Sequence, residues 1–220
     1  MLHVTLPRCL RHLLLTLLFA ALSGCAAQTL PPPIAPLSSV RVGIASAVQP
    51  TGTTDLLAGY IPEKRDLASP DALLHFDSAV LDQTRSQADP ARTIVPIPAP
   101  KGVNPSAQRS PGNNSALHHW VNIGAKAGVD LIIVPQILTW HEREGGTAGV
   151  VSSAEVDIQF YLIDVKDETL LARSVFRDKQ ESLANNLLKA PTFFKRGGKW
   201  ITAQQLAEEG IDRMIKEFGL

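Results

Sequence analysis

One cysteine lies where its thiol can be modified chemically. Cys25 follows closely on an almost wholly apolar run from Leu13 to Leu22. The residues directly before it are Leu22, Ser23 and Gly24. A thiolate is a strong nucleophile that can be acylated, and small residues before it allow a peptidase to grip the backbone. The pattern therefore marks Cys25 as a candidate for modification at its sulfur.

The residues before Cys25 have the order of a signal peptide. A short basic region of Arg8, Arg11 and His12 comes first, and the apolar run after it is about half of the roughly 20 residues that a membrane-spanning helix needs. With the small residues and the cysteine in register, the segment resembles the bacterial lipobox. The resemblance implies that residues 1–24 are removed and that Cys25 carries the lipid. The alternative is an incidental cysteine in a secretory or uncleaved anchor segment.

The residues after Cys25 indicate a location and a tether. Lipoproteins retained in the inner membrane usually carry Asp directly after the cysteine, whereas this chain has Ala26 there. The resemblance therefore implies the periplasmic face of the outer membrane. Residues 25–38 contain four prolines, which favour an extended chain. We expect a lipidated tether over 25–38 and a single periplasmic domain over 39–220.

Composition excludes several classes of protein. The 220 residues are 45% hydrophobic and 19% charged, which is typical of a globular chain. Lys+Arg and Asp+Glu number 21 each, so there is no basic excess that would attract nucleic acid. Cys9 and Cys25 are the two cysteines. Because Cys9 leaves with the signal peptide and Cys25 is lipidated, we expect no disulfide and no redox or Cys–His catalysis.

The stretch Thr192–Trp200, TFFKRGGKW, is the most unusual in composition. It places aromatic and basic side chains around two adjacent glycines. Aromatic rings can stack on sugar faces or insert into a partner, and basic groups attract anions. We predict that an envelope partner contacts this stretch through Phe193, Phe194, Lys195, Arg196, Lys199 and Trp200. The alternative is that the rings cap the core beside the last helix and the basic groups stay solvated.

Histidines offer an alternative chemistry. His118 and His119 are adjacent in a helical pattern, so their side chains point about 100° apart and do not easily share one ion. His141–Glu142 has neither an HExxH context nor a cysteine partner. We therefore expect no metal site, and solvated or interface histidines. The chain also lacks the GxxxxGK[ST] and GxGxxG motifs, so no nucleotide cofactor is expected.

Serines and carboxylates are the remaining candidates for catalytic residues. Ser115, Ser152 and Ser153 lack the GxSxG context of a serine hydrolase. Four acids gather near a predicted hairpin and imitate a paired-carboxylate site: Asp157, Asp164, Asp167 and Glu168. Strand alternation places Asp157 on the polar face. We therefore expect solvated carboxylates, and a hydrolase that uses such acids is the alternative.

Hydrophobic periodicity predicts eight elements in the order β-α-β-α-β-β-β-α. The strands are expected at 39–47, 92–97, 129–140, 154–165 and 169–180, with a turn over 142–153. The helices are expected at 69–87, 115–127 and 202–218. Crossover units followed by a meander give an α/β (α+β) fold, with a mixed β-sheet flanked by helices.

Individual residues indicate where the helices begin, where a strand is irregular and which side of a helix is buried. Ser69 and Thr202 are expected helix N-caps, since their side chains accept hydrogen bonds from first-turn amides. Pro135 lies inside a predicted strand, which indicates an edge position or a bulge. In the helix over 69–87, the apolar face is expected to consist of Leu73, Leu74, Val80 and Leu81, with Phe76 contributing weakly.

Two stretches resemble a known family of envelope proteins. VRVGIA at 40–45 is of the type that begins its first strand, and AGVDLIIVPQI at 127–137 matches its helix–glycine–strand passage. Over residues 39–180 the chain is thus similar to periplasmic lipoproteins related to the N-terminal domain of TolB, a group that includes CsgG, LpoB and PelC. The resemblance implies a TolB N-terminal-domain-like fold and a non-catalytic assembly or regulatory module, often oligomeric.

Together these features predict an outer-membrane-anchored periplasmic lipoprotein that acts as a binding or assembly accessory in the cell envelope. Secretion, polysaccharide export and a peptidoglycan-related complex are the processes it would serve. The expected partners are the membrane, through the N-terminal lipid, and an envelope protein or polysaccharide. A homo-oligomer is a further option that the resemblance offers. No cofactor, metal or nucleic acid is expected, and the alternative function is an envelope hydrolase with a carboxylate site.

Replacing Cys25 tests the anchor directly. In Cys25→Ala the sulfur that would receive the lipid is gone, so we expect the precursor to stay uncut by the lipoprotein peptidase and the protein to be released or mislocalised. Cell fractionation and mass spectrometry of the N-terminal peptide measure both outcomes. Cys9→Ala changes only the segment that is removed and should be processed normally. Ordinary outer-membrane fractionation of Cys25→Ala would contradict the lipid anchor.

Overall fold

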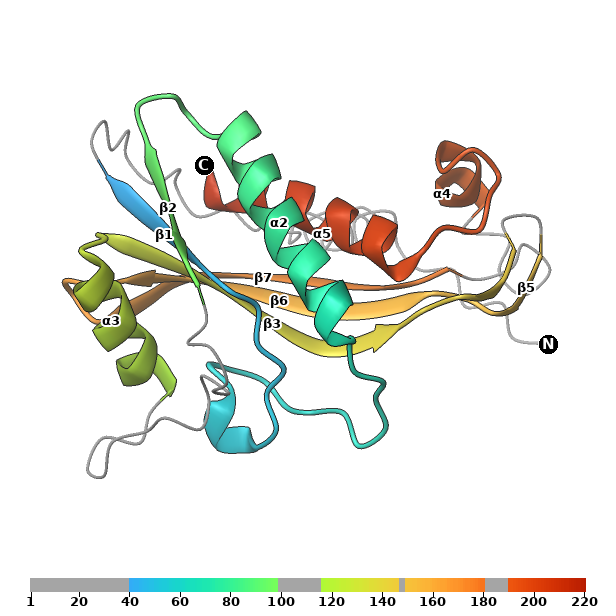
Figure 1. The fold of residues 1–220 in the computed structure, drawn as a ribbon, viewed down its shortest axis with the longest axis horizontal. Helices are drawn as coiled ribbons and strands as arrows, with labels where there is room; N and C mark the ends of the chain where they lie inside the picture. The colour runs from blue at the N-terminus through green and yellow to red at the C-terminus, as the bar shows by residue number, and fades with distance from the viewer. Residues whose placement is uncertain (1–39, 99–115, 147–148, 181–189) are drawn as a thin grey trace, which may run out of the picture. The chain divides into compact units, whose positions relative to one another are not determined.

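A five-stranded mixed β-sheet forms the centre of the protein (Figure 1). The computed structural model describes residues 40–98, 116–146, 149–180 and 190–220, all within one compact unit. The strands are Arg41–Ala45 (β1), Thr93–Ile97 (β2), Leu131–His141 (β3), Glu155–Asp164 (β6) and Thr169–Lys179 (β7). Their order is β2-β1-β3-β6-β7. β1 runs parallel to β2 and β3, and β6 runs antiparallel to β3 and β7.

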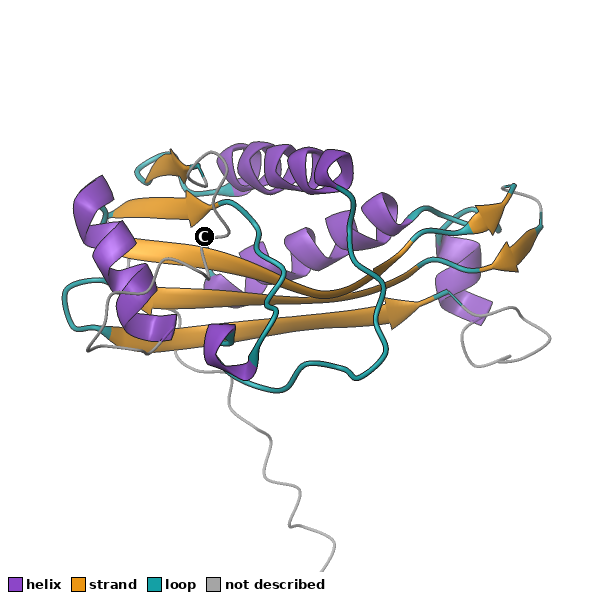
Figure 2. Cartoon of the chain, turned by 60° about the horizontal axis from the view of Figure 1, so that its bottom comes forward, coloured by secondary structure: helices purple, strands orange, loops and turns teal. Residues whose placement is uncertain are grey.

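Helices cover both faces of this sheet. α2 (Pro70–Gln87) and α5 (Ala203–Phe218) lie on one face, and α3 (Ala116–Ala127) lies on the other (Figure 1). The loop between β1 and α2, which contains the short helix η1 (Thr53–Asp55), crosses the face that carries α3 (Figure 2). A short helix, α4 (Ala190–Lys195), precedes α5. The expected element order and the α/β (α+β) class are confirmed.

Strand alternation divides the interior into two cores. On β6, Val156, Ile158, Phe160 and Leu162 contribute to the core beneath α2 and α5, whereas Tyr161 and Ile163 contribute to the core beneath α3. All six side chains are fully buried. Burial on both faces explains why the strands read as near-continuous apolar runs in the sequence. None of the helices in the described ranges is long and apolar enough to cross a membrane.

The helix caps form as expected. The Ser69 side chain accepts the Ala72 N–H at 3.2 Å, and Thr202 forms a reciprocal capping box with Gln205. α5 ends at Gly219, whose φ of 60° is the left-handed conformation that glycine adopts without strain. These bonds satisfy backbone groups that a helix end leaves unpaired, so the two helices that cover the sheet begin at fixed residues.

A small second sheet replaces part of the turn expected over 142–153. β4 (Glu144–Gly145) and β5 (Val150–Ser152) pair antiparallel, with Glu144 opposite Ser152. They continue the hairpin of β3 and β6 beyond the main sheet (Figure 1). Strands of two and three residues are too short to show an alternation in the sequence, and pairing with each other is what defines them.

The edge position indicated by Pro135 is wrong, because β3 lies between β1 and β6. The proline is tolerated for a different reason. β1 pairs with β3 only as far as Ile133, and the Pro135 carbonyl instead accepts the Val48 N–H at 3.1 Å. The nitrogen of Pro135 faces the same side, where β1 has already ended, so no ladder bond is lost there. A bulge does occur in β3, between Ile137 and Thr139.

The expected apolar face of α2 needs correction. Phe76 and Val80 are fully buried, whereas Leu74 is 68% exposed. The Phe76 ring lies against Trp140 in an edge-to-face contact with centroids 5.9 Å apart. Residues four apart lie on one side of a helix, so the buried face follows Phe76, Val80 and Thr84. Leu74 falls outside that stripe.

Glycine at position 210 permits close packing between α5 and β7. A Cβ atom added there would lie 2.8 Å from Cγ and 3.1 Å from Cβ of Phe176, well inside contact distance. Both atoms lie near the base of the phenylalanine side chain, so a rotation of the ring would not relieve the clash. The backbone of α5 or β7 would have to shift. Gly210 thus sets the distance between the helix and the sheet.

The variant Gly210→Ala tests this contact. Alanine in a helix is normally about 1 kcal/mol better than glycine, but overpacking against Phe176 costs roughly 1–3 kcal/mol. We therefore expect a net loss of stability, measured as a lower midpoint of urea unfolding. In the matched control Gly146→Ala the added Cβ meets nothing within 4 Å, and the midpoint should not change. A more stable Gly210→Ala protein would overturn the packing argument.

Candidate partner-binding groove

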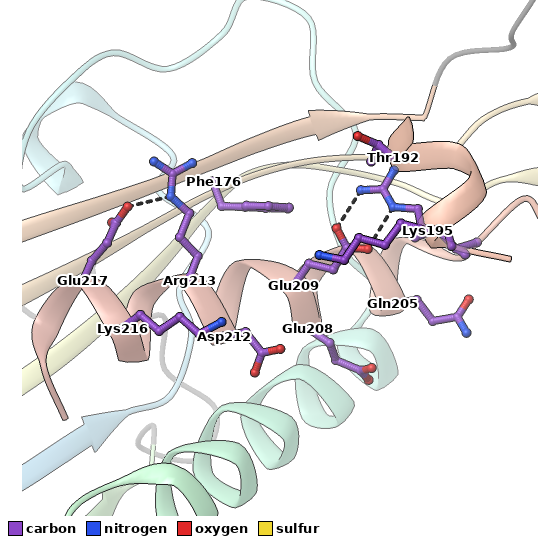
Figure 3. Close-up of a pocket in the computed structure, with 12 residues that line it drawn as sticks. Phe176, Thr192, Lys195, Gln205, Glu208, Glu209, Asp212, Arg213, Lys216 and Glu217 are labelled. Atoms are coloured by element: carbon purple, nitrogen blue, oxygen red, sulfur yellow. Dashed lines mark hydrogen bonds and ion pairs between the residues drawn. The ribbon is translucent and has the colours of Figure 1, made fainter. Parts of the chain in front are cut away.

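A groove of about 740 Å³ runs along α5 and reaches α4 and β7 (Figure 3). Three residues of the stretch whose composition predicts recognition line it: Thr192, Lys195 and Arg196. The residues that line it are Phe176, Thr192, Lys195, Arg196, Ile201, Gln205, Glu208, Glu209, Asp212, Arg213, Lys216 and Glu217. Most are polar or charged residues, but their carbon chains, with Phe176 and Ile201, give the groove slightly more apolar than polar surface.

Arg196 lies at the α4 end of the groove and is held by two carboxylates. Its Nη2 lies 2.6 Å from Asp178 Oδ2 and 2.7 Å from Glu209 Oε2, and its Nε lies 2.8 Å from Glu209 Oε1. Its side chain is 7% exposed. Burial alone lowers the pKa of Arg196, but the hydrogen bonds and charges of Glu209 and Asp178 outweigh it and raise the pKa. Arg196 therefore fastens α4 to α5 and β7.

The other predicted contact residues differ in exposure. Lys195 and Lys199 are exposed, and the Phe194 side chain is 66% exposed. Trp200 is half-buried, and its carbonyl accepts a hydrogen bond from Arg143 Nη1 at 2.7 Å. The side chain of Phe193 lies outside the described residues. In the stretch 192–200, Phe194, Lys195 and Lys199 thus expose their side chains, while the backbone at Trp200 is hydrogen-bonded to the domain.

The α5 wall of the groove carries alternating charges. Arg213 Nε lies 2.6 Å from Glu217 Oε1, one helical turn away. Asp212 accepts a hydrogen bond from Gln87 of α2 at 2.8 Å. Exposed pairs of this kind contribute little to stability. They do present guanidinium, carboxylate and amide groups side by side, which suits a ligand that both donates and accepts hydrogen bonds.

The side chains of the three basic residues of β7 contact residues of the neighbouring strand β6. Arg177 lies 2.6 Å from Asp157, and Lys179 lies 3.0 Å from Glu155. Arg173 donates to the side-chain oxygen of Gln159 at 2.8 Å. The hydrogen bond from Arg177 to Asp157, followed by the charge of that carboxylate, raises the pKa of Arg177. The outer strand of the sheet is therefore lined with cations whose partners lie on its neighbour.

Among the four acids near the hairpin, Asp157 does not form a carboxylate pair with Asp164. Asp157 is 3% exposed, so the expectation that it is solvated is wrong; Arg177 compensates its buried charge. Asp164 accepts the Asp167 N–H at 2.8 Å and closes the turn after β6. Asp157 and Asp164 lie seven residues apart on one strand, which is about 23 Å. Glycosidase carboxylates lie within about 10 Å of each other.

The histidines are likewise separated. His118 Nδ1 lies 3.5 Å from Glu168 Oε2, near the turn after β6. His141 lies at the opposite end of β3, where its ring bonds Asp66 and Ser152. Within the described ranges, no group of three or more histidine, cysteine, aspartate or glutamate side chains could hold a metal ion. Sequence reasoning missed the partners of His141 because they lie 75 and 11 residues away.

A second cavity, of about 320 Å³, lies at the carboxyl ends of β1 and β2 beside α2. Asp77 is the charged residue of its lining, and its Oδ1 accepts the Ala47 N–H at 2.7 Å. Burial raises the pKa of Asp77, while the hydrogen bonds from Ala47 and Ser46 lower it in part. The carboxylate thus binds the backbone just after β1. No motif in the sequence predicts this contact between Asp77 and Ala47.

Comparisons with known proteins give a likeness in fold. No protein-family model matches the chain, and no curated protein matches it in sequence. The structure of a PelC dodecamer from Paraburkholderia phytofirmans is 14% identical, with 86% of this chain and 93% of that chain covered and a TM-score of 0.47. The hypothetical protein CT253 from Chlamydia trachomatis is also 14% identical, with coverages of 82% and 98% and a TM-score of 0.43.

The LpoB C-terminal domain from Salmonella enterica is 12% identical, with coverages of 64% and 84% and a TM-score of 0.30. PelC and LpoB are two of the lipoproteins that the sequence resembles, so the suspected group does recur among the structural neighbours. Every one of these TM-scores lies below 0.5. The function of this chain must therefore be argued from its own residues.

Arg196→Ala tests whether this arginine fastens α4. The substitution leaves the carboxylates of Asp178 and Glu209 without their cation, and we expect a loss of roughly 1.5–3 kcal/mol in unfolding free energy, measured by urea denaturation. Arg196→Lys should recover only part, since an ammonium cannot make the bidentate contact. Lys195→Ala is the exposed neighbouring control and should change stability by less than about 0.5 kcal/mol. Equal stability of all three variants would refute the role.

Proposed function

We propose that this protein is a lipid-anchored accessory protein on the periplasmic face of the outer membrane and that it binds an envelope partner in the groove between α4 and α5. The groove is the observation that supports the proposal most. Its volume of about 740 Å³ falls in the range of ligand sites, and it contains residues that composition alone predicts to make contacts.

The lining of the groove suits a hydroxyl-rich partner such as an envelope polysaccharide, and the exposed lysines of the 192–200 stretch suit an anionic one. Thr192 and Gln205 offer a hydroxyl and an amide, and Glu208 offers a carboxylate. These groups donate to and accept from sugar hydroxyls. Lys195 at the rim and Lys199 nearby add positive charge. An envelope protein with an acidic surface is the alternative partner.

The proposed anchor and tether would bring the domain close to such a partner. The lipid proposed on Cys25 adds about 0.8 kcal/mol of membrane affinity for each buried methylene group. Proline-rich sequences such as 25–38 favour an extended chain of about 3.1 Å per residue, which suits the proposed role as a spacer. Self-assembly into a homo-oligomer stays a prediction from the resemblance. The carboxylate hydrolase is not supported by Asp157, which is buried, bonded to Arg177 and about 23 Å along the strand from Asp164.

Charge reversal at the two exposed lysines tests the binding role without disturbing Arg196. In Lys195→Glu/Lys199→Glu the attraction for an anionic partner becomes repulsion, so we expect at least a tenfold loss of partner recovery. The measurement uses purified lipoprotein in two arms: co-sedimentation with isolated envelope polysaccharide, and affinity capture of envelope proteins identified by mass spectrometry.

The matched control carries the same change in charge elsewhere. Lys64→Glu/Lys126→Glu alters two exposed lysines, one in the loop before α2 and one in α3. It should bind like the unmodified protein in both arms. Loss of recovery in the protein arm alone identifies the alternative partner. Unchanged recovery in both arms for the Lys195/Lys199 variant would reject the groove as the binding site.

A further inference from the structure

Three side chains from separate segments form a hydrogen-bonded chain at the carboxyl end of β3. The Nδ1 atom of His141 lies 2.5 Å from Asp66 Oδ2. The Nε2 atom of the same ring lies 2.7 Å from Ser152 Oγ. The order is thus carboxylate, imidazole, hydroxyl, with one ring nitrogen for each neighbour.

The chemistry of the partners decides where the protons lie. An ionised carboxylate can only accept a hydrogen bond, so in the neutral ring Nδ1 carries the proton and donates it to Asp66. Nε2 is then the acceptor, and the hydroxyl of Ser152 donates to it. A hydroxyl that points its proton at a basic nitrogen, while a third group orients the base, is the arrangement of an activated nucleophile.

Several contacts hold the three groups in place. The Trp140 N–H donates to the backbone carbonyl of Asp66 at 2.9 Å, directly beside His141. Gln49 bonds both backbone groups of Ala68 and so fixes the chain just after Asp66. Ser152 is held by the pairing of β5 with β4. The constellation therefore rests on strand and backbone contacts as well as on the two side-chain bonds.

We propose that Ser152 is a nucleophile that accepts the acyl group of a carboxylic ester. His141 is its general base, and Asp66 is a positioning residue that orients the ring. The ring of His141 is 26% exposed and Ser152 is half-buried, so an ester in solution can reach them. The side chain of Asp66 is 64% exposed, so its role is to orient the ring rather than to supply a buried charge.

The reaction proceeds in two balanced steps. Ser152 Oγ attacks the carbonyl carbon while its proton passes to His141 Nε2, and the ester bond to the leaving alcohol breaks as that alcohol takes the proton. Water then attacks the acyl-serine, gives a proton to His141, and releases the acid as Ser152 recovers the proton. Asp66 stays ionised throughout. The ester and water are the only reactants.

This activity goes beyond the proposed binding function and does not depend on it. None of the three residues lines the groove between α4 and α5. The carboxylate hydrolase considered from the sequence used different residues. A serine motif could not have revealed the site, because Asp66, His141 and Ser152 follow one another in the chain without the GxSxG context.

Covalent labelling tests the nucleophile without requiring a known substrate. The full-length lipoprotein in detergent is treated with a fluorophosphonate probe, which replaces its fluoride by the serine oxygen. We expect one adduct per chain, mapped to Ser152 by peptide mass spectrometry, and slow hydrolysis of p-nitrophenyl acetate. Ser152→Ala should abolish both, whereas the adjacent Ser153→Ala should leave both unchanged.

Variants of the base and the positioning residue distinguish activation from mere structure. His141→Gln keeps a hydrogen-bonding side chain but no basic nitrogen, and labelling should fall by at least about 100-fold. Asp66→Asn should slow labelling, and Asp66→Glu should restore part of the rate at equal urea midpoints. An unlabelled native protein, an adduct elsewhere, or a rate indifferent to His141→Gln would overturn the proposal and leave the three groups as a structural latch.

Discussion

The pairing of β3 with β6 is the constraint on which the rest of the structure depends. The two strands pair from Leu131 with Asp164 to His141 with Glu155, and both are buried along nearly their whole lengths. Their side chains alternate between two cores, so both faces need a cover. α2 and α5 must lie on one face and α3 on the other, because an uncovered face would expose a continuous apolar surface.

The same two strands extend beyond β1, the shorter strand beside β3. Their extended ends contact segments that are distant in the sequence. β1 pairs with only three residues of β3. Past that point the carboxyl end of β3 contacts the starts of two helices: Trp140 bonds the backbone of Asp66 before α2, and Glu142 accepts the Ala203 N–H of α5 at 3.2 Å. Both proposed sites, the groove on α5 and the chain of Asp66, His141 and Ser152, are thus positioned from one strand end.

The elements could be predicted from the sequence, whereas the pairs that build the sites could not. Strand alternation, the Ser69 cap and the Thr202 cap act within a few residues, and each is visible locally. Arg196 looks like a solvated cation in TFFKRGGKW, because its partners Asp178 and Glu209 come from other elements. Asp157 looks like a surface acid for the same reason. Only the register of β7 against β6 places Arg177 beside it.

The cations along β7 affect whether two copies of the protein can pair through the edge of the sheet. β7 is an outer strand, and the open edge of a sheet invites pairing with the same edge of a neighbouring molecule. Arg173, Arg177 and Lys179 stand on this strand, each bonded to a residue of β6. Charged side chains on an edge strand disfavour the addition of a further strand. Aggregation of copies through extension of the sheet at β7 is therefore discouraged.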